Sequence, residues 1–142
     1  MNRKLYRPRI LICEDEMMVA AHVAAIVEEC GCEPVGPFAT GREALSAIRR
    51  QAVDAAILDI DLSDGASTPL ARALRQASVR MIVLSGLRTP SPPPEFAGVA
   101  WLDKPVDEAR LQAFCNSTRA LAAINYSVKH KPVAEPVAPF AI

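Results

Sequence analysis

Three aspartates follow an apolar run in the segment AAILDIDLSDG, residues 55–65. Asp59, Asp61 and Asp64 come directly after residues that are suited to burial. A buried run seldom ends in several like charges without a partner for them, because an unpaired buried carboxylate costs a large amount of free energy. The segment therefore predicts a site of acidic side chains at the end of a buried strand.

Other short apolar runs also end in polar residues. Glu14 and Asp15 follow the first run, Ser85 follows a later one, and Lys104 lies just after the last. The carboxyl ends of neighbouring parallel strands meet at one edge of a sheet. We therefore expect the carboxylates of Glu14, Asp15 and Asp59 to converge at that edge.

Converging carboxylates predict a bound cation. Like charges in one small pocket repel each other, and one of them is neutralised unless a cation is present. Oxygen ligands favour Mg²⁺, or Mn²⁺, over softer metals. Lys104 would add a fixed positive charge and Ser85 a hydroxyl donor. A carboxylate, a hard cation, an ammonium group and a hydroxyl around one cavity are typical of a site for a phosphoryl group.

The elements that must position these residues alternate along the chain. Short apolar runs predict strands over residues 9–13, 33–38, 53–58, 79–84 and 99–102. Helical spacing predicts helices over residues 16–30, from a capping box at Thr40, from Thr68 with Pro69 to residue 76, and from Asp107 to Ile124. The strands are too apolar for a sheet that is wet on one face. The pattern indicates an α/β fold, a parallel sheet covered by helices on both sides.

Length and composition limit the class of protein. The 142 residues suffice for one domain, and 51% hydrophobic with 23% charged residues is typical of a globular chain. A formal net charge of zero argues against nucleic acid or an anionic membrane as partner. No apolar run approaches the roughly 20 residues of a membrane span. We expect a cytoplasmic protein without membrane insertion, with an extension at 1–8, one domain at 9–127 and a flexible Pro/Ala-rich tail at 128–142.

Four cysteines are present, and three of them lie in apolar periodic segments. A thiol in such a segment usually behaves as a small core side chain. The Cys-Gly-Cys at residues 30–32 could in principle hold a metal or a redox pair. Because no second Cys/His cluster accompanies it, we interpret these thiols as core residues.

Four short motifs, in this order, resemble those of a response-regulator receiver domain. They are CEDE at 13–16, ILDIDL at 57–62, VLSG at 83–86 and LDKP at 102–105. The resemblance covers about residues 9–121, and it implies a flavodoxin-like, doubly wound sheet of five parallel strands in the order 2-1-3-4-5. It also implies two-component signalling, in which a sensor histidine kinase or a phosphotransfer protein supplies a phosphoryl group.

The resemblance assigns roles to the acidic residues. Asp59 matches the aspartate that accepts the phosphoryl group. Asp15 matches a direct metal ligand, and Glu14 matches its acidic neighbour, which commonly acts through water. Asp61 occupies the position whose backbone carbonyl binds the metal. The same resemblance implies that the metal is Mg²⁺ or Mn²⁺.

Further roles follow from the later motifs. Lys104 matches the lysine that contacts the phosphoryl group, and the peptide bond before Pro105 is typically cis in the family. Ser85 matches the switch hydroxyl, and Trp101 the switch aromatic residue, where Tyr or Phe is commoner. Trp101 is alternatively an ordinary core residue. The chain would be a single-domain response regulator that signals by protein–protein interaction, because only the tail follows the last helix.

Two segments depart from the family pattern. Ser63 stands where a proline is usual, and RTPSPPPEF at 88–96 carries four prolines. An ordinary helix cannot form there, so we expect the fourth helix of the fold to be short, distorted or absent. A stand-alone subgroup of receivers from alphaproteobacteria is similar in this region and shares the GPFATGREAL-like stretch at 36–45.

Two other functions remain as alternatives. A phosphatase of the haloacid-dehalogenase type would use Asp59 as nucleophile and Asp61 as acid/base. A receiver-fold binding module that works without phosphorylation is the second.

Two further polar residues near the first helix are expected to have ordinary roles. We expect Glu16 to interact with the helix dipole in the first turn, and His22 to lie on the surface.

Overall fold

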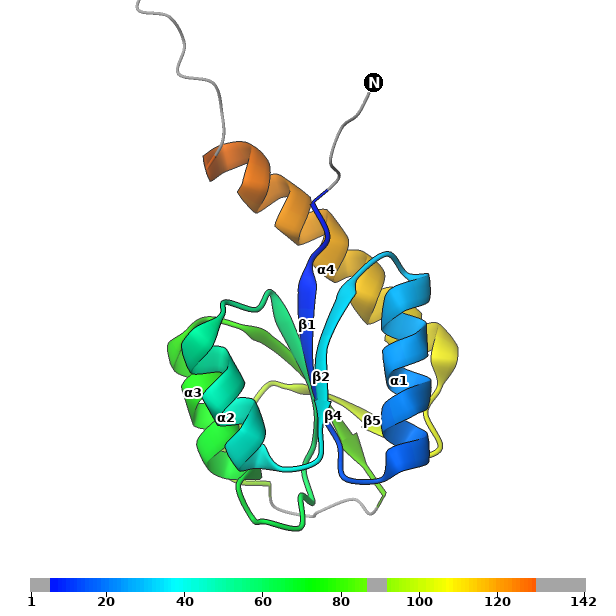
Figure 1. Ribbon diagram of the computed structural model, residues 1–142, viewed down its shortest axis with the longest axis vertical. Coiled ribbons are helices and arrows are strands. Elements are labelled where there is room, and N and C mark those ends of the chain that lie inside the picture. Colours follow the sequence, from blue (N-terminus) through cyan, green and yellow to red (C-terminus); the bar gives the residue numbers. More distant parts are fainter. Residues whose placement is uncertain (1–5, 87–91, 130–142) are drawn as a thin grey trace, which may run out of the picture.

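The computed structural model describes residues 6–86 and 92–129 (Figure 1). Five parallel strands form one sheet in the order β2-β1-β3-β4-β5, which confirms the predicted topology. The strands are β1 (Arg9–Cys13), β2 (Glu33–Phe38), β3 (Ala55–Asp59), β4 (Arg80–Ser85) and β5 (Ala100–Asp103). The helices are α1 (Met17–Glu29), α2 (Gly41–Arg50), α3 (Ser67–Gln76) and α4 (Glu108–Lys129). None of the helices in these residues is long and apolar enough to cross a membrane.

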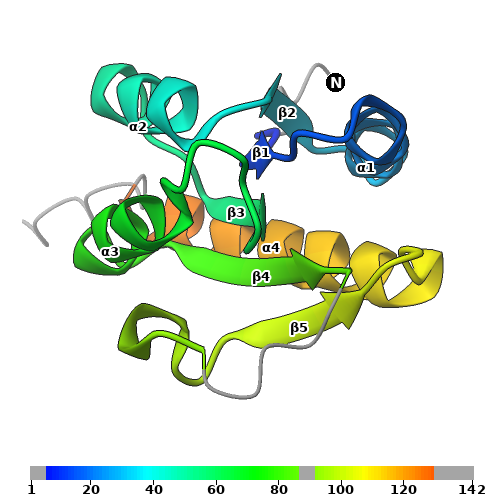
Figure 2. The same cartoon turned by 90° about the horizontal axis from the view of Figure 1, so that it is seen from below.

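Helices cover both faces of the sheet. Figure 2 shows the strands stacked in order, with α2 and α3 on one side and α1 on the other. One core cluster joins the sheet to α1 and α4 through residues such as Val23, Val27 and Leu111. A second joins the sheet to α2 and α3 through Ala44 and Leu70, among others. The strands are apolar on both faces because both faces are buried.

The central strand β3 ends on Asp59, the predicted phosphoryl acceptor. All five residues of β3 are buried, and the strand is paired with β1 on one side and β4 on the other. The sequence predicted a strand over 53–58, whereas β3 runs over Ala55–Asp59. Asp59 is therefore held by the sheet, in register with Leu84 of β4, rather than lying in the loop that follows.

The N-terminal caps predicted for α2 and α3 have different outcomes. The predicted cap of α2 is confirmed, since Thr40 Oγ1 accepts a hydrogen bond of 3.2 Å from the backbone N–H of Glu43. The predicted cap of α3, Thr68, is wrong by two residues, because α3 begins at Ser67 and its cap residue, Ala66, has no polar side chain. Ser67 instead bonds back into the β3–α3 loop, as described below.

The segment between β4 and β5 has one regular element in its described part. This is the 3-10 turn η1 (Pro94–Phe96), and the buried Phe96 packs under the sheet with the second core cluster. Residues 87–91 of the predicted short or distorted helix lie outside the described residues. The fourth α-helix along the chain, α4, is the C-terminal one and has 22 residues, so it is not short. It ends at Lys129, and the predicted tail beyond it also lies outside the described residues.

Candidate phosphoryl-transfer site

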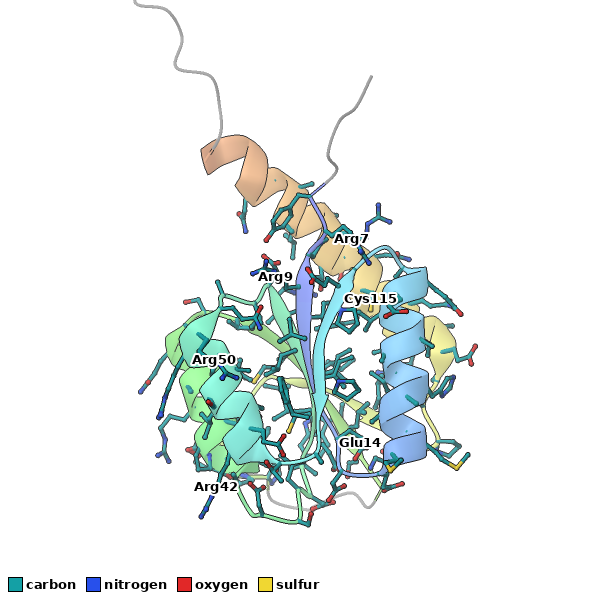
Figure 3. The ribbon with its side chains drawn as sticks, in the orientation of Figure 1. Arg7, Arg9, Glu14, Arg42, Arg50 and Cys115 are labelled. Atoms are coloured by element: carbon teal, nitrogen blue, oxygen red, sulfur yellow. The ribbon has the colours of Figure 1, made fainter. Side chains whose placement is uncertain are left out.

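Three carboxylates meet at the carboxyl ends of β1 and β3, as predicted. Oxygen atoms of Glu14, Asp15 and Asp59 all lie within 4.8 Å of one another. Glu14 and Asp59 are each only 2% exposed. Figure 3 labels Glu14 at the edge of the sheet where the chain leaves β1 for α1. A hard cation with water completing its shell fits this set of donors, which consists of oxygen atoms alone.

Lys104 brings one positive charge to this cluster. Its Nζ lies 2.6 Å from Glu14 Oε1 and 3.1 Å from Asp59 Oδ2. The backbone holds the lysine at this position, because Lys104 N–H donates to the carbonyl of Ser85 at 2.9 Å. The peptide bond between Lys104 and Pro105 is cis, as expected. Burial disfavours the ammonium form, but the surrounding carboxylates outweigh it and raise the pKa of Lys104.

Glu14 is a buried carboxylate whose pKa is shifted by its surroundings. Burial raises its pKa to about 7, and the adjacent carboxyl group of Asp59 adds to the shift. Lys104 acts in the opposite direction. Glu14 Oε1 is fully buried and, despite the close ion pair, has no partner in hydrogen-bond geometry among the described residues. A buried oxygen of this kind is what an additional cation would satisfy.

Backbone groups hold the other two carboxylates in place. Asp59 Oδ1 accepts a hydrogen bond of 2.8 Å from the N–H of Asp61. Asp15 Oδ2 accepts one of 3.1 Å from the N–H of Ser63. Although burial raises the pKa of Asp15, the hydrogen bonds from Ser63 hold it below its ordinary value. Asp15 therefore stays ionised, as a metal ligand must be.

An open cavity of about 470 Å³ lies over this cluster. Its walls are formed by Asp15, Glu16, Asp59, Asp61, Ser63, Gly86 and Lys104. The acceptor candidate Asp59 therefore borders the cavity although the residue as a whole is buried. A cavity of this size with carboxylate and ammonium groups on its wall suits a small phosphorylated group rather than an apolar ligand.

The two predicted switch residues lie on neighbouring strands, and one of them directly precedes a cavity residue. Ser85 ends β4 and is 1% exposed, whereas the following Gly86 lines the cavity. Trp101 is half-buried on β5, where its ring lies 6.4 Å from that of Phe96 at an interplanar angle of 59°. Trp101 is in register with Val83, and Ser85 with Asp103, so the two residues occupy neighbouring strands.

Three residues with roles at the site were not identified from the sequence. Glu16 is the cap residue at the start of α1, so its role as a dipole partner stays a prediction, and its Oε1 also lies 3.0 Å from Lys104 Nζ. Ser63 was noted only as a departure from the family, yet its N–H holds Asp15. Ser67 Oγ donates to the carbonyl of Asp59 at 3.1 Å and accepts from Leu62 N–H at 3.3 Å. The acidic CEDE motif could have indicated Glu16, but no local signal indicates the two serines.

Two of the polar residues noted at the outset serve the scaffold. Asp64, the third aspartate of the opening segment, accepts hydrogen bonds from the N–H groups of Gly41 and Arg42 at 3.2 Å. It therefore caps α2 from a neighbouring loop and lies outside the carboxylate cluster. His22 is exposed, as expected, and pairs with Glu108 at 2.7 Å.

The family model for the response regulator receiver domain matches residues 10–116. The chain belongs to the response-regulator receiver family. Receiver domains are signalling modules that accept a phosphoryl group rather than turn over a substrate, and they bind Mg²⁺ at an acidic pocket. Histidine kinases or phosphotransfer proteins typically phosphorylate them. The haloacid-dehalogenase alternative requires its Asp-x-Asp on the first strand, whereas Asp59 ends β3.

Several solved structures share the fold over nearly their whole length. The receiver domain of a CheY-like response regulator protein from Methanospirillum hungatei is 25% identical, with a TM-score of 0.73, over 84% of this chain and 99% of that one. A sensor protein from Polaromonas is 27% identical, with a TM-score of 0.70, over 82% and 98%. The receiver domain of AraT from Geobacillus stearothermophilus is 23% identical, with a TM-score of 0.73, over 85% and 99%. Among curated proteins, no sequence relative matches the chain.

Proposed function

We propose that this receiver domain accepts a phosphoryl group on Asp59 and signals through protein–protein contacts. The observation that carries the proposal is the placement of Asp59 between Lys104 Nζ and the carboxylates of Glu14 and Asp15. A buried carboxylate that faces an open cavity and has a cationic neighbour is suited to act as a nucleophile toward a phosphoryl donor. The donor would be the phosphohistidine of a sensor kinase or phosphotransfer protein.

In the reaction, a carboxylate oxygen of Asp59 attacks phosphorus and the bond to the donor imidazole nitrogen breaks. The imidazole leaves with the electron pair, and an acyl phosphate forms on Asp59. Asp15, Glu14 and Asp59, with the backbone carbonyl of Asp61, would hold Mg²⁺ or Mn²⁺, which offsets charge on the transferring phosphoryl oxygens. Lys104 offsets charge from the other side, since its ammonium already contacts Asp59 Oδ2.

The conformational response would begin at Ser85. Its hydroxyl lies at the end of the strand next to that of Asp59, so it can move toward new phosphoryl oxygens. Trp101 would then occupy the space that Ser85 leaves, and the surface formed by β4, the described part of the Pro-rich segment at 92–96 and α4 would change. Trp101 is the only tryptophan, so its fluorescence with and without beryllofluoride reports this step directly. An unchanged spectrum would favour the ordinary core role.

The direct test is Mg²⁺-dependent labelling with radioactive acetyl phosphate. We expect the wild-type domain to take up one phosphoryl group, and EDTA to prevent it. Asp59→Asn should take up none. The matched control is Asp61→Asn, an exposed residue in the same loop whose proposed contribution is a backbone carbonyl; it should still be labelled. Label retained on Asp59→Asn would refute the assignment of the acceptor.

A binding module independent of phosphorylation remains the second candidate. The observation in its favour is the segment between β4 and β5, whose described part contains a 3-10 turn in place of an α-helix. Measuring the affinity of a partner kinase with and without beryllofluoride separates the two functions. Equal affinities would favour the module, and a difference would favour the phosphorylation-dependent switch.

A further inference from the structure

The loop between β3 and α3 departs from the family pattern at Ser63, where a proline is usual. Proline has no backbone N–H, so a proline at this position could not donate a hydrogen bond from the main chain. Ser63 does donate one, since its backbone nitrogen lies 3.1 Å from Asp15 Oδ2. This chain therefore provides Asp15 with a donor that the usual residue at position 63 lacks.

Asp15 needs such a donor more than the two carboxylates beside it. Glu14 and Asp59 are buried, and both lie against the ammonium of Lys104. Asp15 is only half-buried, and it belongs to the loop that follows β1. An oxygen of its carboxylate nevertheless lies within 4.8 Å of oxygens of the other two. The bond from the backbone restricts the direction of this carboxylate, and partners of metal ligands support metal affinity in this way.

The position of Ser63 is itself fixed by the next residue, Asp64. Asp64 Oδ1 accepts a hydrogen bond of 3.2 Å from the N–H of Gly41, and Oδ2 accepts one of 3.2 Å from the N–H of Arg42. Figure 3 labels Arg42 at the end of α2 that lies on the same edge of the sheet as Glu14. Asp64 therefore attaches the loop to the start of α2, directly beside the N–H that Asp15 accepts.

A close backbone approach accompanies this attachment. A Cβ on Gly41 would lie 2.6 Å from the Cβ of Ala66 and 2.9 Å from the carbonyl oxygen of Ala66, so only glycine fits there. Both residues are buried. The glycine of the GPFATGREAL stretch is therefore needed where α2 meets the loop that borders the carboxylates.

The two ends of the loop are held as well. Ser67 Oγ accepts a hydrogen bond from the N–H of Leu62 and donates one to the carbonyl of Asp59. Between them, the N–H of Gly65 donates to the carbonyl of Leu62 at 2.9 Å. With both ends and its middle restrained, the loop is suited to hold a donor at a fixed place.

We propose that Ser63 is a positioning residue for the divalent cation, because its backbone N–H holds Asp15 in the direction of the cation site. Asp64 is a second positioning residue, which fixes that N–H relative to the start of α2. The inference rests on the cation site of the proposed function, and it adds a route by which α2 influences the affinity of that site. Loss of the N–H should weaken cation binding even where the fold is kept.

The alternative is that these hydrogen bonds stabilise the loop and do nothing else. Their loss would then lower the free energy of unfolding in the absence of metal and leave the affinity for a cation unchanged. Cation affinity and metal-free stability must therefore be measured on the same variants.

The test compares Ser63→Ala with Ser63→Pro in the full chain. The first removes the hydroxyl and keeps the N–H, whereas the second removes both. Binding of Mn²⁺ is followed by the loss of the electron paramagnetic resonance signal of the free ion. We expect the dissociation constant for Mn²⁺ to be about three to ten times higher for Ser63→Pro than for Ser63→Ala. Displacement of Mn²⁺ by Mg²⁺ should give a similar ratio, and urea unfolding in metal-free buffer measures the stability of both variants.

A second variant tests the attachment to α2 and does not depend on a proline. Asp64→Ala removes the acceptor for the N–H groups of Gly41 and Arg42, and it should raise the dissociation constant for Mn²⁺ by a factor of about two to five. The matched control is Asp54→Ala. Asp54 is also half-buried and accepts a backbone N–H, that of Arg9 at 2.8 Å, but it lies at the opposite edge of the sheet. Its Mn²⁺ affinity should equal that of the wild type.

Two outcomes would overturn the proposal alone. Equal Mn²⁺ affinities for Ser63→Ala and Ser63→Pro would exclude the role of the N–H, and equal affinities for Asp64→Ala and Asp54→Ala would exclude the route from α2. If Ser63→Pro does not fold, the aspartate pair decides the matter. A wild-type chain that binds no Mn²⁺ would instead remove the cation site of the proposed function, and this inference with it. Because the assay needs no phosphoryl donor, it does not depend on the labelling of Asp59.

Discussion

The two ends of α1 lie beside two very different buried clusters. At the N-terminal end, Glu16 adjoins the carboxylates and Lys104. At the C-terminal end, Cys30 packs in one core cluster with the thiols of Cys32 and Cys115. Both clusters contain ionisable groups that water scarcely reaches, and in the first the buried carboxylates are held against the ammonium of Lys104. The difference shows how burial acts on chemistry, because a thiol remains neutral when it is buried, whereas a carboxylate that must stay ionised needs a cation.

The carboxylate cluster and the thiol cluster also differ in their access to the outside of the molecule. The carboxylate cluster includes a Glu14 oxygen that pairs with Lys104 but has no partner in hydrogen-bond geometry among the described residues, and the cluster opens to a cavity. The thiol cluster, in contrast, is packed into the core and is reached mainly through Cys30. The first arrangement is suited to receiving a charged group from outside, and the second to packing α1 and α4 against the sheet.

Of the predicted changes, removing the positive charge of Lys104 should have the largest effect on stability and on phosphoryl labelling. In Mg²⁺-free buffer we expect Lys104→Ala to lower the free energy of unfolding by about 3–5 kcal/mol, since it leaves buried carboxylates without a partner. Urea unfolding measures this, and added Mg²⁺ should restore part of the stability. Labelling by acetyl phosphate should fall by a factor of about 100 even with Mg²⁺.

The control for that variant is Arg72→Ala, which breaks an exposed pair with Glu95 at 3.2 Å. Its cost should remain below about 1 kcal/mol, because exposed ion pairs contribute little. Equal losses for the two variants would mean that the carboxylate cluster is less dependent on Lys104 than its geometry indicates.

The next effect is a pH dependence from Glu14. Its folded-state pKa of about 7 lies above the ordinary value of 4.5, so the folded protein holds this proton more tightly than the unfolded chain. The resulting stabilisation is complete below pH 4.5 and is lost as the pH rises through 7. In Mg²⁺-free buffer, we therefore compare the free energy of unfolding of the wild type with that of Glu14→Gln. The difference, wild type minus variant, should fall by about 2 kcal/mol over that range. Saturating Mg²⁺ should remove the fall, because the cation favours the ionised carboxylates.

The contribution of the thiol cluster to stability should depend on pH in a more alkaline range than that of Glu14. Removing the buried sulfur in Cys115→Ala should cost about 1–2 kcal/mol through the cavity it leaves. The pKa of Cys115 is raised from 9.0 to about 12. Its contribution should therefore stay constant below about pH 8 and decline as the pH rises from 9 toward 12. Unfolding curves at pH 6, 8 and 10 check this, and a change between pH 6 and 8 would contradict the neutral thiol.

Glu16→Gln should have the smallest effect on stability. Its side chain is 61% exposed, so we expect a cost below about 1 kcal/mol. The labelling rate should nevertheless change, by roughly two- to tenfold, because Lys104 loses one of three carboxylates that hold its ammonium. The matched control is Glu108→Gln, an exposed acid paired with His22 away from the cavity. If both variants label at the wild-type rate, the contact of Glu16 with Lys104 has no part in the reaction.

Strand-end residues were predictable because their pattern is local. Asp59, Asp15 and Lys104 each follow an apolar run, and parallel strands must bring such positions to one edge. The capping of α2 by Thr40 is equally local. Ser63 and Ser67 were not predictable as supports of the carboxylates, since their hydrogen bonds depend on how the β3–α3 loop folds back on itself and on the loop after β1.

By itself, the amino-acid sequence determined the order of elements, the parallel sheet and the edge at which the acids, the hydroxyl and the ammonium converge. Hydrophobic periodicity and strand-end chemistry are properties of neighbouring residues, so they can be recognised without coordinates. Only the tertiary structure decided that Glu16 reaches Lys104 and that the Cys32 thiol reaches the backbone carbonyl of Cys115. Those contacts join segments more than eighty residues apart, and their geometry depends on how loops close and helices cross, which no local pattern encodes.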